Sequence, residues 1–308
     1  MIGFPVIAAL LPVVLIWVFT SIETPHVTAQ IEEELGDLGR ENISQLALSI
    51  RNACEASHRM IQKDLNRRLE DAYGFLQVVG GLSLSSEKVT WNAQNQRTGE
   101  EKQVTLPKMV VMGSTWLGKI RNMSERTPYL DQIKGKLGGT YAIFQRMNGK
   151  GDMIQVASTV PAPNGQRAIG MVMPAQENGL PNPAIQEVLK NNIHSGLAYV
   201  GDQWYISLFK PLKDKAGKVF GMLFTGIPNR PPESLRKAIM DTKAGKTGYV
   251  YVLGGVLPFH RGHYIISKDG ERDGEDIWDS QDSNGRYYIR SLVQKATGLR
   301  EDGITFER

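Results

Sequence analysis

The sequence predicts an α+β protein with an N-terminal transmembrane helix, a long helical spine and two tandem antiparallel-sheet modules, the second of them truncated. An apolar run opens the chain, a helical repeat without proline follows it, and short strands with turn signals fill the remainder. With 308 residues, 41% hydrophobic and 22% charged, the chain has the composition of an ordinary globular protein of about two domains.

Residues 1–22 are expected to form a transmembrane anchor. No charged residue occurs from Ile2 to Ile22, and a bilayer core needs roughly 20 apolar residues in a helix. Trp17 lies near one end of the run, where an amphipathic ring suits the headgroup layer. A cleaved signal peptide is the alternative, but it usually has a basic start and a small-residue cleavage site. This run has neither, so a retained anchor is favoured.

Residues 23–86 are expected to form one long helix. Apolar residues recur at steps of three or four from Ile31 to Val79, with charged residues between them, as on a helix with one solvated face. No proline occurs between His26 and Ser86, and at 1.5 Å per residue the helix would run roughly 75–80 Å. The helix could pair with a second subunit or serve as a spine for the modules. We expect both, and therefore a homodimer through this helix.

Residues 87–228 are expected to form the first sheet module. Strands are predicted at Val89–Ala93, Lys102–Leu106, Met109–Met112, Thr140–Met147, Met153–Val160, Arg167–Pro174, Leu197–Val200, Trp204–Leu212 and Val219–Ile227. Asn-Gly pairs at 148–149 and 164–165 are strong hairpin signals. Helices are predicted at Tyr129–Lys136 and at Pro183–Asn192, the second with Asn182 as its N-cap and proline in its first position.

Residues 229–308 are expected to form a second module that repeats the beginning of the first. Its predicted elements are a helix at Pro232–Thr242, strands at Gly248–Leu253 and His263–Ser267, a helix at Tyr287–Ala296 and a strand from Gly303 to Phe306. The two strands that close the first sheet have no counterparts before Arg308, which would leave open sheet edges. The natural protein is therefore expected to continue past Arg308.

Enzyme chemistry finds little support in the sequence. Gly245–Thr247 resembles the end of a phosphate-binding loop, but Met240 stands where the loop needs its first glycine. His260 and His263 lack a third metal ligand at a suitable spacing, and the single Cys54 excludes a cysteine-based zinc site. No catalytic residue, metal or cofactor is predicted. The 36 basic and 32 acidic residues are mixed along the chain, which also argues against a nucleic-acid partner.

Four segments in the second half of the chain resemble a known family. They are Asp202–Leu212, Gly217–Gly226, Gly245–Gly254 and His260–Gly270. Their order and spacing are similar to those of the Cache 3/Cache 2 fusion sensor of bacterial methyl-accepting chemotaxis proteins. The resemblance implies two PAS-like modules on a long periplasmic helix, a membrane-distal one over 87–228 and a membrane-proximal one over 229–308. It also implies a cytoplasmic signalling part that this chain lacks.

Ligand recognition is the function that remains, because small-molecule sites combine aromatic walls with a few polar groups. In the first module the candidate ligand-binding residues are Trp116, Tyr141, Arg146, Trp204, Tyr205, Ser207 and Lys210. The second module offers Tyr249, Tyr251, Arg261 and His263. Arg146, Arg167 and Lys210 could hold a carboxylate, an arginine in bidentate fashion.

Strand periodicity divides these candidates between two faces. Tyr141, Ile143 and Gln145 share one face, and Phe144 and Arg146 share the other. Trp204, Ile206 and Leu208 likewise oppose Tyr205, Ser207 and Phe209. The sequence leaves open which face lines a pocket. Related amino-acid receptors carry an arginine two residues before the Trp-Tyr pair, and Asp202 stands there instead, so amino-acid binding is not supported.

The predicted function is the periplasmic sensing region of a transmembrane chemoreceptor in the bacterial inner membrane. A small ligand, polar or anionic, would bind one module, and the missing cytoplasmic part would pass the signal to a chemotaxis kinase and its adaptor. Two alternatives stay open. The same sensor could precede a histidine kinase or a nucleotide cyclase, or the modules could bind another periplasmic protein.

Overall fold

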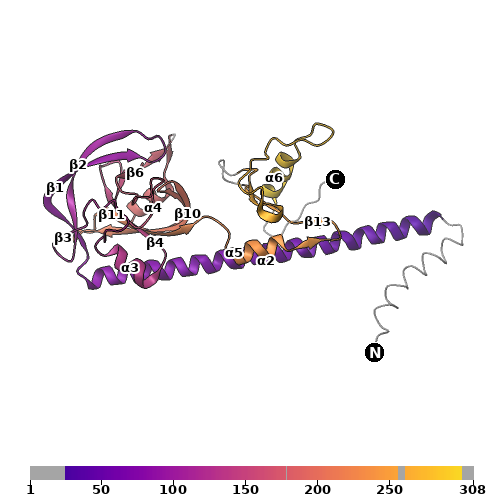
Figure 1. Ribbon diagram of the computed structural model, residues 1–308, viewed down its shortest axis with the longest axis horizontal. Helices are drawn as coiled ribbons and strands as arrows, with labels where there is room; N and C mark the ends of the chain where they lie inside the picture. The colour runs from indigo at the N-terminus through magenta and orange to yellow at the C-terminus, as the bar shows by residue number, and fades with distance from the viewer. Residues whose placement is uncertain (1–24, 178, 256–260, 300–308) are drawn as a thin grey trace, which may run out of the picture. The chain divides into compact units, whose positions relative to one another are not determined.

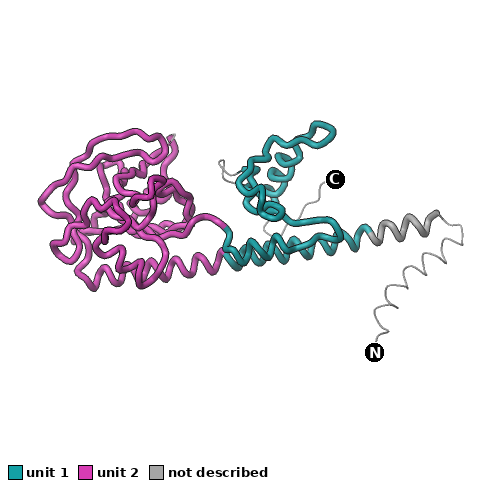
Figure 2. Tube along the Cα trace, viewed as in Figure 1, with its two compact units in different colours: residues 1–57, 231–308 teal, residues 58–230 magenta. Residues whose placement is uncertain are grey.

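The computed structural model describes residues 25–177, 179–255 and 261–299 (Figure 1). The chain divides into two compact units, which Figure 2 distinguishes by colour. The large unit comprises residues 58–230, and the small unit combines residues up to 57 with those from 231 onward. Helices and mainly antiparallel strands occur together, so the predicted α+β class is confirmed.

The expected transmembrane helix falls outside the part of the chain that the structure describes, since residues 1–24 are not included. Among the described residues, no helix combines the length and the apolar content that crossing a membrane requires. The anchor therefore stays a prediction from the sequence. The predicted last strand, from 303 to 306, also lies outside the described residues.

Helix α2 extends over 54 residues, Pro25–Val78, where the spacing of apolar residues predicts one long helix. Two glycines end it earlier than expected. Gly80 and Gly81 have φ angles of 98° and 74°, and Gly81 N donates to Leu76 O at 2.8 Å. This is the hydrogen bond of a Schellman motif, which closes a helix with a left-handed residue. Strand β1, Leu82–Asn95, then takes in the last residues that the sequence placed in the helix.

A nine-stranded sheet forms the body of the large unit. In spatial order its strands are β3-β2-β1-β6-β5-β4-β11-β10-β9, and every neighbouring pair is antiparallel except β1 and β6. The other strands are β2 Glu101–Val111, β3 Thr115–Trp116, β4 Thr140–Arg146, β5 Met153–Ser158, β6 Met171–Met173, β9 His194–Val200, β10 Gln203–Lys213 and β11 Val219–Pro228. A separate hairpin joins β7, Gln176–Glu177, to β8, Leu180–Pro181.

Two strand predictions in the large unit are corrected. The two strands expected on either side of Pro107 are one strand, β2, because Pro107 lies opposite Lys88, where the pairing of β1 and β2 is irregular. A proline is tolerated at such an irregular point because its missing N–H removes no regular hydrogen bond of the ladder there. The strand expected over Arg167–Pro174 shortens to β6, since the residues before Met171 form a loop.

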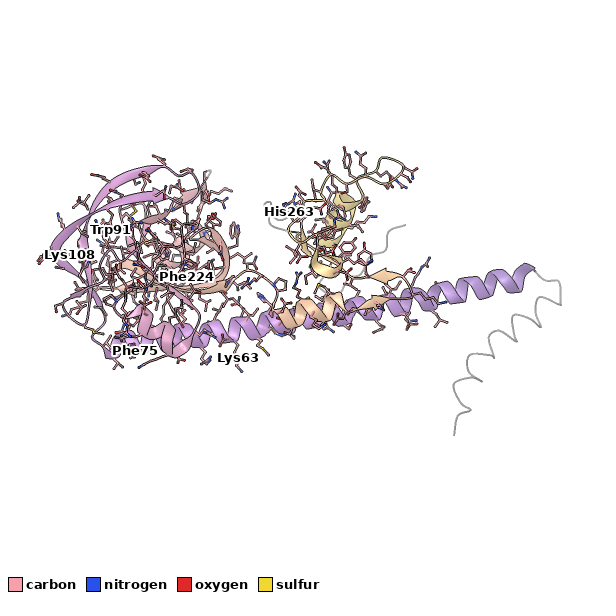
Figure 3. All side chains as sticks on the ribbon, viewed as in Figure 1. Lys63, Phe75, Trp91, Lys108, Phe224 and His263 are labelled. Carbon is pink, nitrogen blue, oxygen red and sulfur yellow. The ribbon has the colours of Figure 1, made fainter. Side chains whose placement is uncertain are left out.

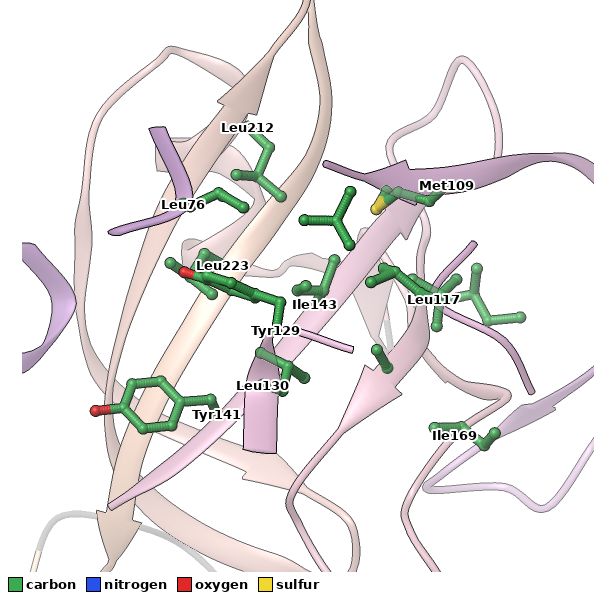
Figure 4. Close-up of a cluster of buried hydrophobic side chains, with 14 of the residues drawn as sticks. Leu76, Met109, Leu117, Tyr129, Leu130, Tyr141, Ile143, Ile169, Leu212 and Leu223 are labelled. Carbon is green, nitrogen blue, oxygen red and sulfur yellow. The ribbon is translucent and has the colours of Figure 1, made fainter. Parts of the chain in front are cut away.

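The sheet separates two hydrophobic cores. Helix α2 and α3, Leu130–Leu137, cover one face, and Tyr141 and Ile143 point into this core. Figure 4 shows part of this cluster, with Leu76 of α2 among the side chains. Helix α4, Pro183–Leu189, covers the other face, into which Phe144 points. The alternation along β4 is the one that the sequence predicts.

The small unit contains short elements within its described residues. They are α5 Glu233–Met240, β12 Lys243–Ala244, β13 Gly248–Tyr249, β14 Val252–Leu253, β15 Tyr264–Ile266, the 3-10 turn Lys268–Gly270 and α6 Tyr288–Gly298. Its strands pair only as β12-β13 and β14-β15, so the strand predicted over 248–253 is split in two. Tyr264, Ile277, Ile289 and Val293 form its core. The second sheet that the sequence predicts is thus reduced to two short pairs in the described part.

Asn182 caps α4 as the sequence predicts, because its Oδ1 accepts from Ala184 N at 3.1 Å and from Ile185 N at 3.4 Å. We expect Asn182→Ala to lower the free energy of unfolding of the large unit by about 1 kcal/mol. Urea denaturation would measure the loss. Asn182→Asp retains a capping oxygen and should unfold like the parent chain, so an equal loss in both variants would contradict the capping role.

Candidate functional site

A polar groove lies at the end of β1, where this strand meets the loop from Pro161 to Gly170. Two adjoining cavities of about 180 and 320 Å³ form the groove. Both have in their walls Gln94, Ala162, Asn164 and Met171. We call this pair of cavities the β1 groove.

One wall of the β1 groove comes from the alternation of β1. Trp91 and Ala93 are buried in the core under the sheet, which turns Asn92 and Gln94 to the opposite side. Glu101 of β2 pairs with Gln94 across the ladder and lines the same cavity. In β1, the apolar residues Trp91 and Ala93 thus alternate with the amides Asn92 and Gln94. One side of the strand packs in the core, and the other side forms a polar wall of the groove.

The other wall is the loop from Pro161 to Gly170, which folds back on itself as a tight turn. Ala162 N donates to Gln166 O at 2.7 Å, and the loop docks on β1 through a bond from Gln94 N to Gly170 O at 2.9 Å. Gly170 has a φ of 80°, and a Cβ there would lie 2.9 Å from Asn92 O. Only glycine combines this backbone conformation with so close an approach.

Arg121 supplies the positive charge of the groove. In the described part of the chain its side chain makes one hydrogen bond, from Nη1 to Ile169 O at 3.3 Å, and no ion pair with a carboxylate. A guanidinium has five N–H donors in a planar fork that matches a carboxylate. Arg121 therefore retains donors for an anionic group in the groove.

Arg167 also borders the groove, but its guanidinium is occupied by the protein itself. Its side chain is 3% exposed and binds both carboxylate oxygens of Asp131, at 3.0 and 2.9 Å. The remaining donors bind the carbonyls of Asn122, Met123, Glu125 and Ser158. Arg167 was one of three candidates to hold a ligand carboxylate. Its bonds instead fix the segment that carries Arg121.

Asp202 lines the larger cavity and connects it to an aromatic pair. Its carboxylate accepts a hydrogen bond from the hydroxyl of Tyr199; burial, together with this carboxylate, raises the pKa of Tyr199 to about 12. Tyr199 and the predicted site residue Trp204 meet edge to face at 5.5 Å, and the guanidinium of Arg97 covers both rings at 5.2 and 5.7 Å. Trp204 is thus connected to the groove through its contact with Tyr199, which binds Asp202.

Three other predicted residues of the first module lie at separate places on the large unit. Trp116 is in β3, an edge strand, with the ammonium of Lys108 over its ring at 5.1 Å. Arg146 binds the carbonyls of its own turn and borders a different cavity of about 300 Å³. Lys210 pairs with Glu70 of α2 at 2.7 Å.

The last three predicted residues of the first module are buried. Tyr141 lies in the core beneath α2, and burial raises its pKa. Tyr205 packs edge to face on Phe224 in the core beneath α4, the region of Phe224 in Figure 3. Ser207 is also buried and donates to Gly196 O at 2.8 Å. The structure brings none of the seven residues into the walls of the β1 groove, and their role in binding stays a prediction.

The predicted residues of the second module belong to the small unit and gather around aromatic rings. Tyr249 and Tyr251 meet at 6.0 Å, and Arg261 covers the ring of Trp278 at 5.5 Å. His263 places Nδ1 at 3.2 Å from Arg261 O. No three His, Cys, Asp or Glu side chains converge as a metal site would need, within the part of the chain described; His260 lies outside it.

Residues 28–305 match the family model of the Cache 3/Cache 2 fusion domain. The chain belongs to this family. No curated protein matches the chain. A Cache fusion domain is an extracellular or periplasmic module that senses a ligand, and it is not catalytic. The β1 groove is therefore a candidate for the sensing site of a Cache fusion domain.

Proposed function

We propose that this Cache fusion domain senses a small polar molecule with a carboxylate or a similar anionic group, bound in the β1 groove. The observation that carries the proposal is Arg121, a guanidinium in the groove wall with one hydrogen bond and no carboxylate partner in the described chain. The amides of Asn92, Gln94 and Asn164 stand in the same walls. They offer donors and acceptors that fix the orientation of a polar ligand.

The size and charge of the groove support a small metabolite. Arg121 lines the smaller cavity, of about 180 Å³, which adjoins the larger one of about 320 Å³; small-molecule sites usually measure about 300–1,000 Å³. Glu101 and Asp202 add acceptors at two places in the walls. A hydroxyl or ammonium group on the ligand would bind them while its anionic group binds Arg121.

The receptor context follows from the family resemblance. We place the domain in the periplasm, anchored in the bacterial inner membrane by residues 1–22 and paired with a second copy through α2. A methyl-accepting chemotaxis protein is the first candidate for the whole receptor, signalling through a chemotaxis kinase and adaptor. A histidine kinase or a nucleotide cyclase is the alternative. Identification of a signalling domain in the same polypeptide would distinguish the three.

One observation favours a protein-binding module as a second candidate. The face of the sheet beneath α4 is filled by rings, since Phe144, Phe209 and Phe224 lie within 6.5 Å of one another. No small molecule would enter a core packed in this way. If the β1 groove binds nothing, recognition of another periplasmic protein is the function that remains.

A thermal-shift screen of the purified chain against mono-, di- and tricarboxylates, amino acids and sugars would test the proposal. For the carboxylate that stabilises most, we expect Arg121→Gln to weaken binding by about tenfold to a hundredfold, because hydrogen bonds to a charged group contribute about 1.5–3 kcal/mol. Calorimetric titration would measure the affinities.

Arg146→Gln is the matched control, because Arg146 is a predicted site residue in a different cavity. It should bind the carboxylate with unchanged affinity. The reverse result, a loss with Arg146→Gln and none with Arg121→Gln, would move the site to the cavity beside Arg146. If no carboxylate raised the melting temperature of the chain, the result would favour the protein-binding module.

A further inference from the structure

Residues 121–139, here called the connecting segment, join the wall of the β1 groove to helix α2. At the groove end, Arg167 N donates to Arg121 O at 2.7 Å, and the Arg167 guanidinium binds Asp131 within α3. At the α2 end, Arg68 Nη1 donates to Leu137 O, where α3 ends. Both attachments lie within the large unit.

Tyr129 makes the central contact between the connecting segment and α2. Its side chain is fully buried, and its hydroxyl donates to Ala72 O in α2. Its ring stacks on Phe75 of α2, with centroids 6.0 Å apart and planes 17° apart. Figure 3 labels Phe75 on α2, and Figure 4 shows Tyr129 in the cluster with Leu76. A shift of Tyr129 would therefore act directly on α2.

The backbone of Tyr129 is strained. Its φ is 69° and its ψ is −57°, and Leu130 N donates to Pro128 O at 2.9 Å across it. These values describe a γ-turn of the rare, strained kind, at a residue with a bulky side chain. Such a conformation persists only where the surroundings hold it from more than one side.

Two sets of bonds hold this γ-turn. On the groove side, the Asp131 carboxylate accepts from Thr127 N at 2.6 Å and from the Arg167 guanidinium, so it closes the turn across Tyr129. On the α2 side, Tyr129 is held by its bond to Ala72 and by its stacking on Phe75. If either set of bonds were loosened, the γ-turn would be free to relax to an unstrained conformation, and the contact on the other side would then move.

We propose that the γ-turn at Tyr129 couples the state of the β1 groove to helix α2. The inference rests on the proposed function, in that the groove is where the ligand binds. A ligand on Arg121 changes the position of the segment that Arg167 holds, and the change reaches α2 through Tyr129. Such coupling is reciprocal, so a change made at the α2 contact must also appear at the groove.

Reciprocity permits a test without any ligand. In Tyr129→Phe the ring stays and the bond to Ala72 O is lost. Residue-resolved hydrogen–deuterium exchange of the purified chain would follow the Arg167 amide, which binds Arg121 O at the groove. We expect this amide to exchange about fivefold faster, the factor that about 1 kcal/mol of lost stabilisation gives.

Tyr205→Phe is the matched control, because Tyr205 is another buried tyrosine of the large unit, in the core beneath α4. It should leave the Arg167 amide at the parent rate. Amides of the β10–β11 ladder should exchange at the parent rate in both variants, which separates coupling from general destabilisation. Arg68→Gln releases the other attachment to α2, at Leu137 O, and should also accelerate the Arg167 amide.

The proposal is overturned if Tyr129→Phe accelerates exchange only around Ala72 while the Arg167 amide keeps its parent rate. It is equally overturned if Tyr205→Phe has the same effect as Tyr129→Phe. If only the proposed ligand class is wrong, the results differ. No carboxylate would then stabilise the chain in the thermal-shift screen, but Tyr129→Phe would still accelerate exchange of the Arg167 amide.

Discussion

Replacing Arg167 with methionine is expected to lower the free energy of unfolding of the large unit by about 3–5 kcal/mol. The guanidinium is 3% exposed and pairs with Asp131, whose side chain is itself 23% exposed. The variant leaves this carboxylate without its charged partner and removes the side-chain donor from four backbone carbonyls. Removal of one member of a buried pair is costly because the other charge stays in a poorly solvated place.

Urea denaturation followed by tryptophan fluorescence would measure this loss. Three of the five tryptophans, Trp91, Trp116 and Trp204, lie in the large unit, so the signal reports on it. Arg121→Met is the matched control, because Arg121 lies in the same groove wall with a single hydrogen bond, and it should change the stability by no more than about 0.5 kcal/mol. Similar losses in the two variants would mean that Arg167 is not the residue that fixes the connecting segment.

The same comparison separates folding from ligand binding. Arg167 uses its donors on the protein, whereas Arg121 retains donors for a ligand. Arg121→Met should therefore fold like the parent chain and bind the carboxylate weakly. Two arginines in one groove wall thus have different roles, and the number of hydrogen bonds that each makes within the protein predicts which role it has.

Local signals in the sequence predicted much of the fold. The steps of three and four in the apolar residues, without proline, predict α2, and Asn182 before Pro183 predicts the start of α4. The alternation along β4 and β10 predicts which residues share a face, since Ile206 and Leu208 lie in one core and Tyr205 in the other. Each of these features is set by residues close together in the chain, which is why sequence patterns reveal them.

The β1 groove could not be predicted because it depends on contacts between distant segments. The loop that forms one wall docks on β1 through Gly170 and Gln94, and Arg167 reaches 36 residues back to Asp131. The parallel pairing of β1 with β6 joins residues still farther apart in the chain, Gln94 and Met171. Glycine at 170 was the one local signal available, since so close an approach of two backbones leaves no room for a side chain there, but a single glycine does not identify its partner.

The aromatic residues chosen from the sequence lie at other places than the walls of the β1 groove. Tyr141 and Tyr205 were chosen as ring donors to a pocket, and both are buried in the two cores. The local sequence around an aromatic residue in a strand is the same whether its ring lines a pocket or fills a core, so the sequence does not distinguish the two cases. The difference depends on whether α2 or α4 covers it, which is a tertiary contact.

The second large effect is expected at Leu69 of α2. Leu69 is fully buried in the core that α2 forms with the sheet, so Leu69→Ala should lower the free energy of unfolding of the large unit by about 2–5 kcal/mol. The cost combines the lost burial of the side chain with the cavity left behind. Urea denaturation measures it on the same tryptophan signal. A loss below about 1 kcal/mol would mean that the sheet does not depend on α2 for its core.

Met60 provides the matched control on the same helix, because its side chain is 74% exposed. Met60→Ala should leave the unfolding of the large unit within about 0.5 kcal/mol of the parent chain. The two variants test separately the two roles expected of α2, namely packing against the sheet and pairing with a second subunit. If α2 also pairs with a second copy through its exposed face, Met60→Ala weakens self-association in analytical ultracentrifugation without changing the unfolding of the unit. Leu69→Ala should do the reverse, because its side chain belongs to the core of a single chain.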